Sequence, residues 1–476
     1  MNAAAKEDKY TLMTTCPVER LVCKMAVPTI ISMLVTGLYN IVDTFFVGRI
    51  GNEATAGVGL ILPIMAIIQA FGFFFGQGSG NYISHSLGAR HIEKAEAMAA
   101  TGSISALIFG VVLMAVGFVF KKGVLFVLGA RDGLLDPLTI QYAEEYMCII
   151  LCGAPFMCVS CVLNQQLRFQ GNAVFSMVGL VFGAVLNCVL DPIFIFTLGM
   201  AVKGAALATV VGQTVSCLML YAGTLRSDSL KIHIKNFSPT AFYYKNIFVG
   251  GLPSLIRQSL SSVSVMCLNS AAAAAATAAM AAQTVAAFTV VNKITMLAFS
   301  ALLGFGQGFQ PICGFNYGAK RFGRVRAGYL FCLKVSFVFL IIMSALGYVL
   351  APGAVALFRN DADVIRIGTT VMRCQCATFW LIGLVVTTNM VYQNLGRVGG
   401  GAVLAMARNG LYFIPAVLIL PQVMSVPIWG VYIAQPVADV CAFLTALPLA
   451  VHVCRDLKQK QAEQETAEAA GRSKVM

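Results

Sequence analysis

Long apolar runs recur from one end of the sequence to the other, and they set the class of fold. Each run is about 20 residues or longer, the length of an α-helix that crosses a bilayer. A membrane barrel would instead show alternating segments of about 10 residues. Hydrophobic residues make up 58% of the 476 residues and charged residues only 11%, which leaves too little polar surface for a soluble domain. We therefore expect an all-α polytopic membrane protein.

The apolar runs number about twelve by this length criterion. They lie at approximately Leu21–Val47, Ala56–Ser79, Met98–Phe120, Tyr142–Leu167, Val174–Leu198, Gly204–Leu225, Ile247–Ser270, Ala281–Gln310, Gly328–Leu350, Gly368–Tyr392, Ala402–Leu420 and Ile428–Val453. An even number of spans puts both termini on one side of the membrane.

The distribution of Lys and Arg predicts which side that is. The chain carries 33 Lys and Arg against 20 Asp and Glu, a net charge of +13. With the N-terminus inside, the basic clusters at 226–245, 320–326 and 455–460 fall in cytoplasmic segments, as the positive-inside rule requires. We expect a multi-pass protein of the inner (plasma) membrane with both termini cytoplasmic. The basic charge belongs to these loops and needs no nucleic acid as a partner.

Three landmarks in the first half of the chain recur in the second half in the same order. Val27-Pro28 resembles Leu252-Pro253, Gln77-Gly78 resembles Gln307-Gly308, and Arg168-x-x-Gly171 is echoed by Gln393-x-x-Gly396. Six spans per half give the halves the same topology, so they are parallel repeats around a central cavity, an organisation typical of secondary transporters. The expected parts are a cytoplasmic tail (1–20), a six-helix lobe (21–225), a cytoplasmic linker (226–246), a second six-helix lobe (247–454) and a cytoplasmic tail (455–476).

Two carboxylates lie inside apolar runs of the first half alone. Asp43 and Asp191 have Leu268 and Val417 at the matching positions of the second half. An intramembrane carboxylate costs several kcal/mol unless it faces a partner or water, so it indicates a functional site. The alternative is a structural Asp bonded to a neighbouring helix, but a symmetric structural role predicts acids in both halves.

Two further polar residues lie near these carboxylates. Asn187 precedes Asp191 by one helical turn and shares its face, and Thr209 follows the outward start of the next span. We place Asp43, Asp191 and Thr209 about 6–10 Å below the outer boundary, at 1.5 Å per residue. Such oxygen ligands can bind a hard cation such as Na⁺. Two desolvated carboxylates can equally share a proton, so the residues leave both possibilities open.

Polar side chains also follow one face of several spans. Ser32, Thr36, Tyr39, Asn40 and Asp43 form a stripe along the first span; Ser160 and Asn164 lie four apart on the fourth, and Thr209 and Gln213 on the sixth. Such residues line a cavity or join helices by hydrogen bonds. Pro28 removes a backbone hydrogen bond within the first span and permits bending there.

Enzymatic motifs are missing from the sequence. It contains no G-x-x-x-x-G-K-[ST] loop, no H-E-x-x-H and no nucleophile elbow, so we expect no ATP hydrolysis and no enzyme. Cys158-x-x-Cys161 lacks a second Cys pair or a His nearby, so we expect no metal or redox site there.

Several of these motifs together resemble the multidrug and toxic compound extrusion (MATE) family, in its bacterial and archaeal drug-exporter branch. They are Asn40-Ile-Val-Asp43-Thr-Phe-Phe-Val-Gly48, Gly88-Ala-Arg90, Arg168-x-x-Gly171-Asn172, Leu186-Asn187-x-x-Leu190-Asp191-Pro192 and Gly204-Ala-Ala-x-Ala-Thr209. The resemblance covers nearly the whole chain. One departure is the Ala-rich stretch 271–282, to which we assign no chemistry.

The resemblance implies a monomeric membrane antiporter that exports cationic, amphipathic drugs in exchange for H⁺ or Na⁺ and needs no other cofactor. It places the coupling cation at Asp43, Asn187, Asp191 and Thr209. It points to a drug pocket lined by Thr36, Asn40, Ser160, Asn164 and Gln213. Two alternatives stay open: a flippase for a lipid-linked precursor on the same fold, suggested by the intramembrane Arg257 and Arg373, and a membrane receptor or scaffold that transports nothing.

Overall fold

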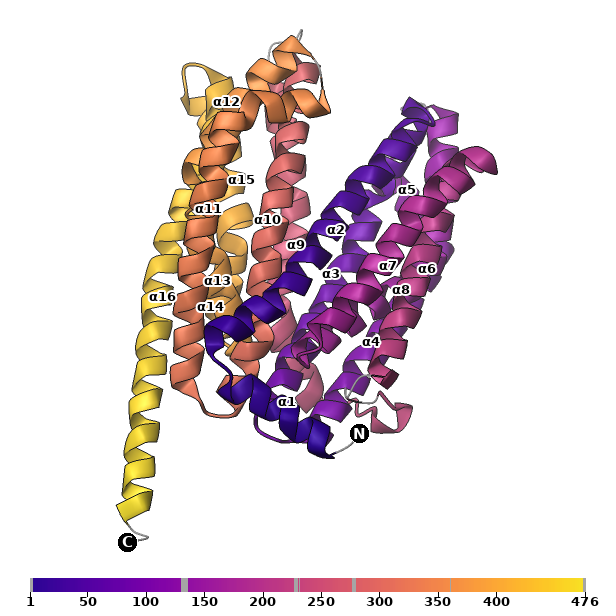
Figure 1. The fold of residues 1–476 in the computed structure, drawn as a ribbon. Coiled ribbons are helices and arrows are strands. Elements are labelled where there is room, and N and C mark those ends of the chain that lie inside the picture. The colour runs from indigo at the N-terminus through magenta and orange to yellow at the C-terminus, as the bar shows by residue number, and fades with distance from the viewer. Residues whose placement is uncertain are drawn as a thin grey trace. The chain divides into compact units, whose positions relative to one another are not determined.

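The computed structural model describes residues 3–129, 136–226, 230, 232–275, 280–359 and 361–473, and no β-strand occurs among them. Part of the Ala-rich stretch, residues 276–279, lies outside this set. Helices correspond to all twelve predicted apolar runs (Figure 1). The all-α fold predicted from the sequence is confirmed.

Seven helical segments carry the first six runs. They are α2 (Val18–Gly48), α3 (Asn52–Gly88), α4 (Ile92–Val119), α6 (Pro137–Phe169), α7 (Ala173–Pro192) with the π-helix η1 (Ile193–Thr197), and α8 (Ala201–Arg226). The second six runs form α9 (Ala241–Ala275), α10 (Ala281–Gly318), α11 (Phe322–Phe358), α12 (Ala362–Phe379) with α13 (Ile382–Asn394), α14 (Val398–Met406) with the π-helix η3 (Ala407–Tyr412) and α15 (Phe413–Val423), and α16 (Pro427–Ser473).

Short helices outside the membrane runs complete the structure. The N-terminal tail forms α1 (Ala3–Thr15), and α5 (Lys121–Val127) and the 3₁₀ turn η2 (Ile234–Asn236) lie in connections. The tail predicted after residue 454 continues as the end of α16, drawn in yellow, to Ser473 (Figure 1).

Ten of the described helices are long and apolar enough to cross a membrane, and α12 with α13 adds an eleventh across a bend of 55°. The remaining predicted run lies in α9, which has 35 residues. Arg257, Gln258 and several serines make α9 more polar than the others. Composition therefore identifies all the predicted spans but this one.

The chain packs as two compact units. One consists of Met1–Tyr10 and Val27–Leu255, the other of Thr11–Ala26 and Ile256–Met476. The boundaries in α2 and α9 fall one to three residues from Pro28 and Pro253, so in each repeat the residues before the proline pack with one unit and the residues after it with the other.

Glycine permits this packing at matching places in the two units. A Cβ on Gly78 of α3 would lie 2.2 Å from the Ile247 carbonyl oxygen, and a Cβ on Gly308 of α10 would lie 2.5 Å from the Ala26 Cα. No side chain fits at either distance. The repeated Gln-Gly motif therefore allows the backbone of α3 to approach α9 closely, and the backbone of α10 to approach α2, as small residues do in membranes.

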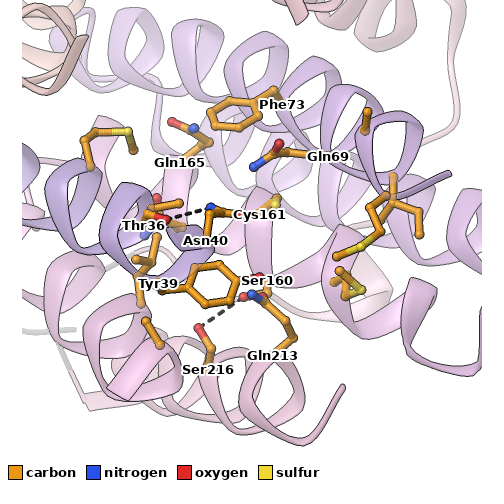
Figure 2. A pocket seen from close by; sticks show the side chains of 18 of the residues that line it. Thr36, Tyr39, Asn40, Gln69, Phe73, Ser160, Cys161, Gln165, Gln213 and Ser216 are labelled. Carbon is orange, nitrogen blue, oxygen red and sulfur yellow. Dashed lines mark hydrogen bonds between the residues drawn. The ribbon is translucent and has the colours of Figure 1, made fainter. Parts of the chain in front are cut away.

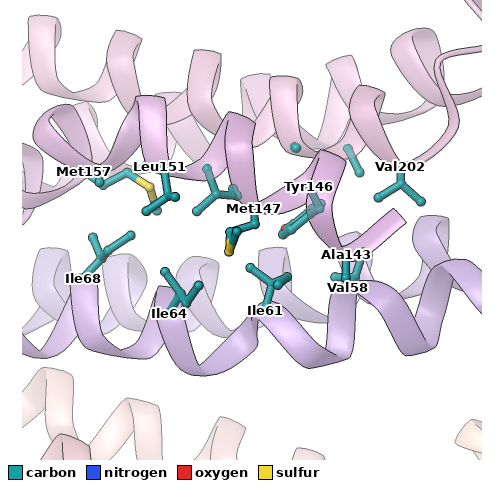
Figure 3. Packing of buried hydrophobic residues seen from close by; sticks show 14 of the residues in the cluster. Val58, Ile61, Ile64, Ile68, Ala143, Tyr146, Met147, Leu151, Met157 and Val202 are labelled. Carbon is teal, nitrogen blue, oxygen red and sulfur yellow. The ribbon is translucent and has the colours of Figure 1, made fainter. Parts of the chain in front are cut away.

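The core of the first unit lies between α3 and α6. Ile61, Ile64 and Ile68 of α3 pack against Met147 and Leu151 of α6 (Figure 3), and all five side chains are buried. In a bilayer this close packing, rather than water exclusion, holds helices together. The cluster fixes the rotation of α6, whose polar residues from Ser160 to Gln165 then lie beside a cavity.

Candidate functional site

Three helices of the first unit bring the predicted cation residues together. α7 supplies Asn187 and Asp191, and α8 supplies Thr209. The Asn187 amide donates from Nδ2 to Asp191 Oδ1 at 3.3 Å and to Thr209 Oγ1 at 3.4 Å. Asp191 is completely buried, and Asn187 and Thr209 are each 2% exposed. The i,i+4 spacing on α7 places Asn187 and Asp191 on one face, as the sequence predicted, and the two side chains are hydrogen-bonded there.

Asp43 on α2 is the fourth member of this group. Its carboxylate is close enough to Asp191 for the two charges to interact. Gly212 of α8 is in tight contact with α7, since a Cβ there would lie 3.1 Å from Asn187 Cβ. This close contact holds Thr209, one turn earlier on α8, against Asn187.

Three oxygen atoms of this group are buried and accept no hydrogen bond from any described residue. They are Asp43 Oδ1, Asn187 Oδ1 and Asp191 Oδ2. Buried acceptors without a donor are costly. Carboxylate, amide and hydroxyl oxygens are ligands for a hard cation, and a proton on one carboxylate would also supply a donor. The donor set therefore fits either Na⁺ or H⁺.

A cavity of about 260 Å³ lies in the same unit (Figure 2). Its lining includes all five residues predicted for a drug pocket, namely Thr36, Asn40, Ser160, Asn164 and Gln213. Apolar walls come from residues such as Met33, Met65 and Phe73. The volume is below the ~300–1,000 Å³ typical of sites for drug-sized ligands, so in this state the cavity holds only part of such a ligand.

The cavity and the cation group are one helical turn apart on each of three helices. Asn40 lines the cavity and Asp43 follows it on α2; Ala184 lines it and Asn187 follows on α7; Gln213 lines it and Thr209 precedes it on α8. Residues three or four apart share a helix face. The two sites are therefore neighbours on a shared wall.

The polar stripe on α2 bonds mainly along its own helix. Ser32 Oγ donates to the Pro28 carbonyl at 3.0 Å, Thr36 Oγ1 to the Ser32 carbonyl at 2.8 Å, and Asn40 Nδ2 to the Thr36 carbonyl at 2.7 Å. Such bonds to the i−4 carbonyl compete with the helix ladder and favour bending. They begin at Pro28, where the ladder already lacks a donor.

Two of the predicted lining residues, Ser160 and Asn164, both line the cavity and join helices by hydrogen bonds. Ser160 Oγ donates to Ser216 Oγ at 3.2 Å (Figure 2). Asn164 Nδ2 donates to the Ser176 carbonyl at 3.0 Å, and Ser176 Oγ donates back to the Asn164 carbonyl at 3.0 Å. Asn164 is therefore held to α7 by two hydrogen bonds, whereas the bonds that Thr36 and Asn40 donate stay within α2.

Two tyrosines also belong to this site; the sequence placed Tyr39 on the polar stripe of the first span but gave no indication of Tyr146. Tyr39 lines the cavity and interacts electrostatically with both Asp43 and Asp191. Tyr146 of α6 is fully buried, donates from its hydroxyl to Met65 Sδ at 3.6 Å and also interacts with both carboxylates. Tyr39 was visible as part of the α2 stripe. Tyr146 gave no such signal, because Ala143 and Ile150, one helical turn away on the same face, are apolar and its orientation depends on how α6 packs on α3.

Comparison with known proteins covers nearly the whole chain. The family model MatE matches twice, at residues 28–193 and 253–418, which confirms the predicted internal repeat. The multidrug export protein MepA of Staphylococcus haemolyticus is 25% identical over 443 residues, 92% of this chain and 95% of that protein. The protein of the same name from Staphylococcus aureus is 25% identical over 456 residues, 95% of this chain and 97% of its own length.

A solved structure has the same fold. It is described as the outward-facing conformation of a multidrug resistance MATE family transporter of the MOP superfamily, and it superposes with a TM-score of 0.87 at 28% identity. The superposition covers 94% of this chain and 98% of the other.

Proposed function

This chain belongs to the MatE family, as its sequence predicted, and from that membership and the geometry above we propose that it is a secondary active multidrug efflux transporter. Its substrates are cationic, amphipathic compounds, and it exports them by antiport with H⁺ or Na⁺. The relatives are named as multidrug exporters. We further propose that it works as a monomer in the plasma membrane with both termini in the cytoplasm.

One observation carries this proposal: a cavity whose described lining holds no Lys, Arg or His adjoins two buried carboxylates. Its lining combines apolar side chains with amides and hydroxyls, which suits an amphipathic ligand. The nearest charges, on Asp43 and Asp191, are negative and weakly screened inside the membrane. A cationic ligand is therefore favoured there over an anionic one.

The same carboxylates supply the coupling. A cation that reaches Asp43 and Asp191 from outside removes the attraction that holds a cationic drug in the cavity. Binding at Asp43 also pulls on α2, which bends near Pro28 and makes the cavity smaller, so the drug leaves. A new drug entering from the cytoplasm displaces the cation, because the two positive charges compete for one negative site.

Transport into inverted membrane vesicles tests the proposal. We expect a cationic dye to accumulate when the lumen is made acidic or is loaded with Na⁺, and the effective gradient identifies the coupling ion. Vesicles without the protein give the background. Failure of both gradients with correctly inserted protein would contradict antiport and favour the flippase.

Replacing Pro28 by alanine tests the bending of α2. Alanine restores the backbone donor and a straight helix. We expect dye transport to fall at least about tenfold, the effect of an added barrier of about 1.4 kcal/mol, while dye binding to the purified protein is retained. A Pro63→Ala variant is the matched control, because Pro63 lies within α3 and does not line the cavity. Wild-type transport by Pro28→Ala would exclude bending at this proline as a required step.

A further inference from the structure

A second cavity, of about 180 Å³, lies in the unit that contains Ile256–Met476. Its apolar lining includes Phe299, Phe379 and Phe413. Its polar lining consists of Ser261, Ser264, Asn292, Thr295, Gln375, Arg408, Asn409 and Gln435. Arg408 is the only charged residue among the described residues that line it. This cavity therefore combines aromatic surface with one cation and several hydrogen-bond donors.

Asp439 of α16 anchors Arg408 from behind the cavity wall. Arg408 Nε donates to Asp439 Oδ1 at 2.9 Å, and the carboxylate side chain is 1% exposed while the Arg408 side chain is 19% exposed. Gln435 Nε2 donates to the same oxygen at 2.9 Å, and Thr378 Oγ1 donates to Oδ2 at 3.4 Å. These bonds occupy both oxygens of Asp439, which does not itself line the cavity.

Only one of the three guanidinium nitrogens of Arg408 takes part in the pair with Asp439. Its bond to Asp439 runs through Nε alone, and neither terminal nitrogen has a hydrogen-bond partner among the described residues. The guanidinium carbon lies 5.0 Å from the centre of the Phe299 ring, which fixes its plane further. Two parallel N–H donors of a guanidinium match the two oxygens of a carboxylate. Arg408 thus presents an oriented anion-binding group.

The repeat shows that this pair is specific to the second half. Arg408 has Gly183 at the displacement of 225 residues between the matched family segments, and Phe182 at the displacement of 226 that pairs Asp191 with Val417. Asp439 lies beyond the matched segments and has Thr214 or Gln213 at these displacements. None of these first-half residues is charged. Gly183 fits tightly against α8, since a Cβ there would lie 2.6 Å from Ser216 Cβ. A side chain the size of arginine has no room at that position. The two halves therefore present different chemistry from equivalent helices.

The charged residues inside the apolar runs also differ between the two halves, with more cations in the second half and more acids in the first. The runs of the second half contain the cations Arg257, Lys293, Lys334, Arg373 and Arg408 and a single acid, Asp439. The runs of the first half contain the acids Asp43, Glu144, Glu145 and Asp191 and a single cation, Lys24. Of these charges, Arg408 is the one that lines the second cavity, and weak screening in the membrane lets it favour an anion there.

We propose that the cavity at Arg408 binds a small aromatic carboxylate, a ligand opposite in charge to the compounds assigned to the first cavity. The carboxylate pairs with the terminal nitrogens of Arg408, and the ring packs against Phe299 and Phe379. The volume, below that of sites for drug-sized ligands, selects a small molecule. This binding site goes beyond the proposed export of cations and does not depend on it.

Binding of 2-naphthoate to the purified full-length protein in detergent tests the proposal, with the uncharged 2-naphthamide as the matched ligand. We expect naphthoate to bind and naphthamide to bind at least about tenfold more weakly, as expected for loss of a charge-assisted hydrogen-bond pair. Arg408→Lys keeps the charge but not the two parallel donors, and we expect it to weaken naphthoate binding by a similar factor.

A double variant, Arg408→Gln with Asp439→Asn, removes both charges together and so leaves no unpaired buried carboxylate. The double variant is expected to lose the preference for naphthoate over naphthamide. It replaces Arg408→Lys as the test if that variant does not fold. Arg373→Lys is the matched control: Arg373 also lies on a membrane helix, against the Tyr348 ring, and does not line the cavity.

The proposal is overturned if the wild-type protein binds naphthoate no better than naphthamide. It is also overturned if the double variant keeps the wild-type preference, or if Arg373→Lys loses it to the same extent. The readout is independent of transport: Asp191→Asn should bind naphthoate as the wild-type does. A failure to export cations would leave naphthoate binding intact, so each of the two proposals can be refuted without the other.

Discussion

Replacing Asp191 with asparagine is expected to reduce gradient-driven transport of a cationic dye to the level of vesicles that lack the protein. Asparagine has nearly the same shape and can still accept from the Asn187 amide, which now bonds to Asp191 Oδ1. It cannot bind or release a proton and is a much weaker ligand for Na⁺. The coupling step is thus removed while the packing of α7 is kept.

Asp43→Asn is expected to have the same effect, because its buried Oδ1 also has no donor among the described residues. The control is Asp363→Asn on α12: this carboxylate is 55% exposed and pairs with Arg366 at the surface, where an ion pair contributes little. Dye transport in vesicles and insertion of each variant are measured together. Wild-type rates in both Asp191→Asn and Asp43→Asn would overturn the assignment of the coupling site.

A bulky side chain that fills the first cavity is expected to cause a large loss of dye binding and transport. Ala66 of α3 lines this cavity and is half-buried, so a tryptophan there can extend into the open volume of about 260 Å³ without displacing the core. We expect Ala66→Trp to weaken dye binding and to lower the transport rate at low dye concentration by about tenfold or more. This corresponds to a loss of about 1.4 kcal/mol of binding free energy.

Leu107→Trp provides the matched control for this substitution. Leu107 is 42% exposed on α4 and does not line the cavity, so the added ring meets lipid. Fluorescence titration of the dye with each purified variant gives the dissociation constants. Equal affinity in Ala66→Trp and the wild type would place the drug elsewhere in the molecule.

Some features of the site follow from local sequence alone. Asn187 and Asp191 meet because a spacing of four residues brings them together on any helix, and the stripe from Ser32 to Asn40 shares a face for the same reason. The repeat is visible because Pro28 and Pro253 lie at equivalent places within α2 and α9. The roles of these residues as cation and drug ligands stay predictions.

Other features depend on contacts between residues far apart in the chain. Tyr146 of α6 meets Met65 of α3 and lies near Asp43 and Asp191 only because α6 is held in one rotation by its packing on α3. Arg408 and Asp439 are 31 residues apart, and no local period joins an arginine on η3 to an acid on α16. Sequence reasoning accordingly recognised the acids of the first half but not the ion pair of the second.

The sequence by itself determined the membrane class, the helical runs, the repeat and the presence of unmatched acids in the first half. These depend on composition and on spacings within one helix, since a bilayer admits only segments that satisfy their own backbone hydrogen bonds. The tertiary structure alone decided which faces meet. It left Asp43 Oδ1 and Asp191 Oδ2 beside one cavity without donors among the described residues, and it placed Arg408 in the lining of another. Close packing at glycines such as Gly212 in the first unit and Gly410 in the second fixes these helix rotations.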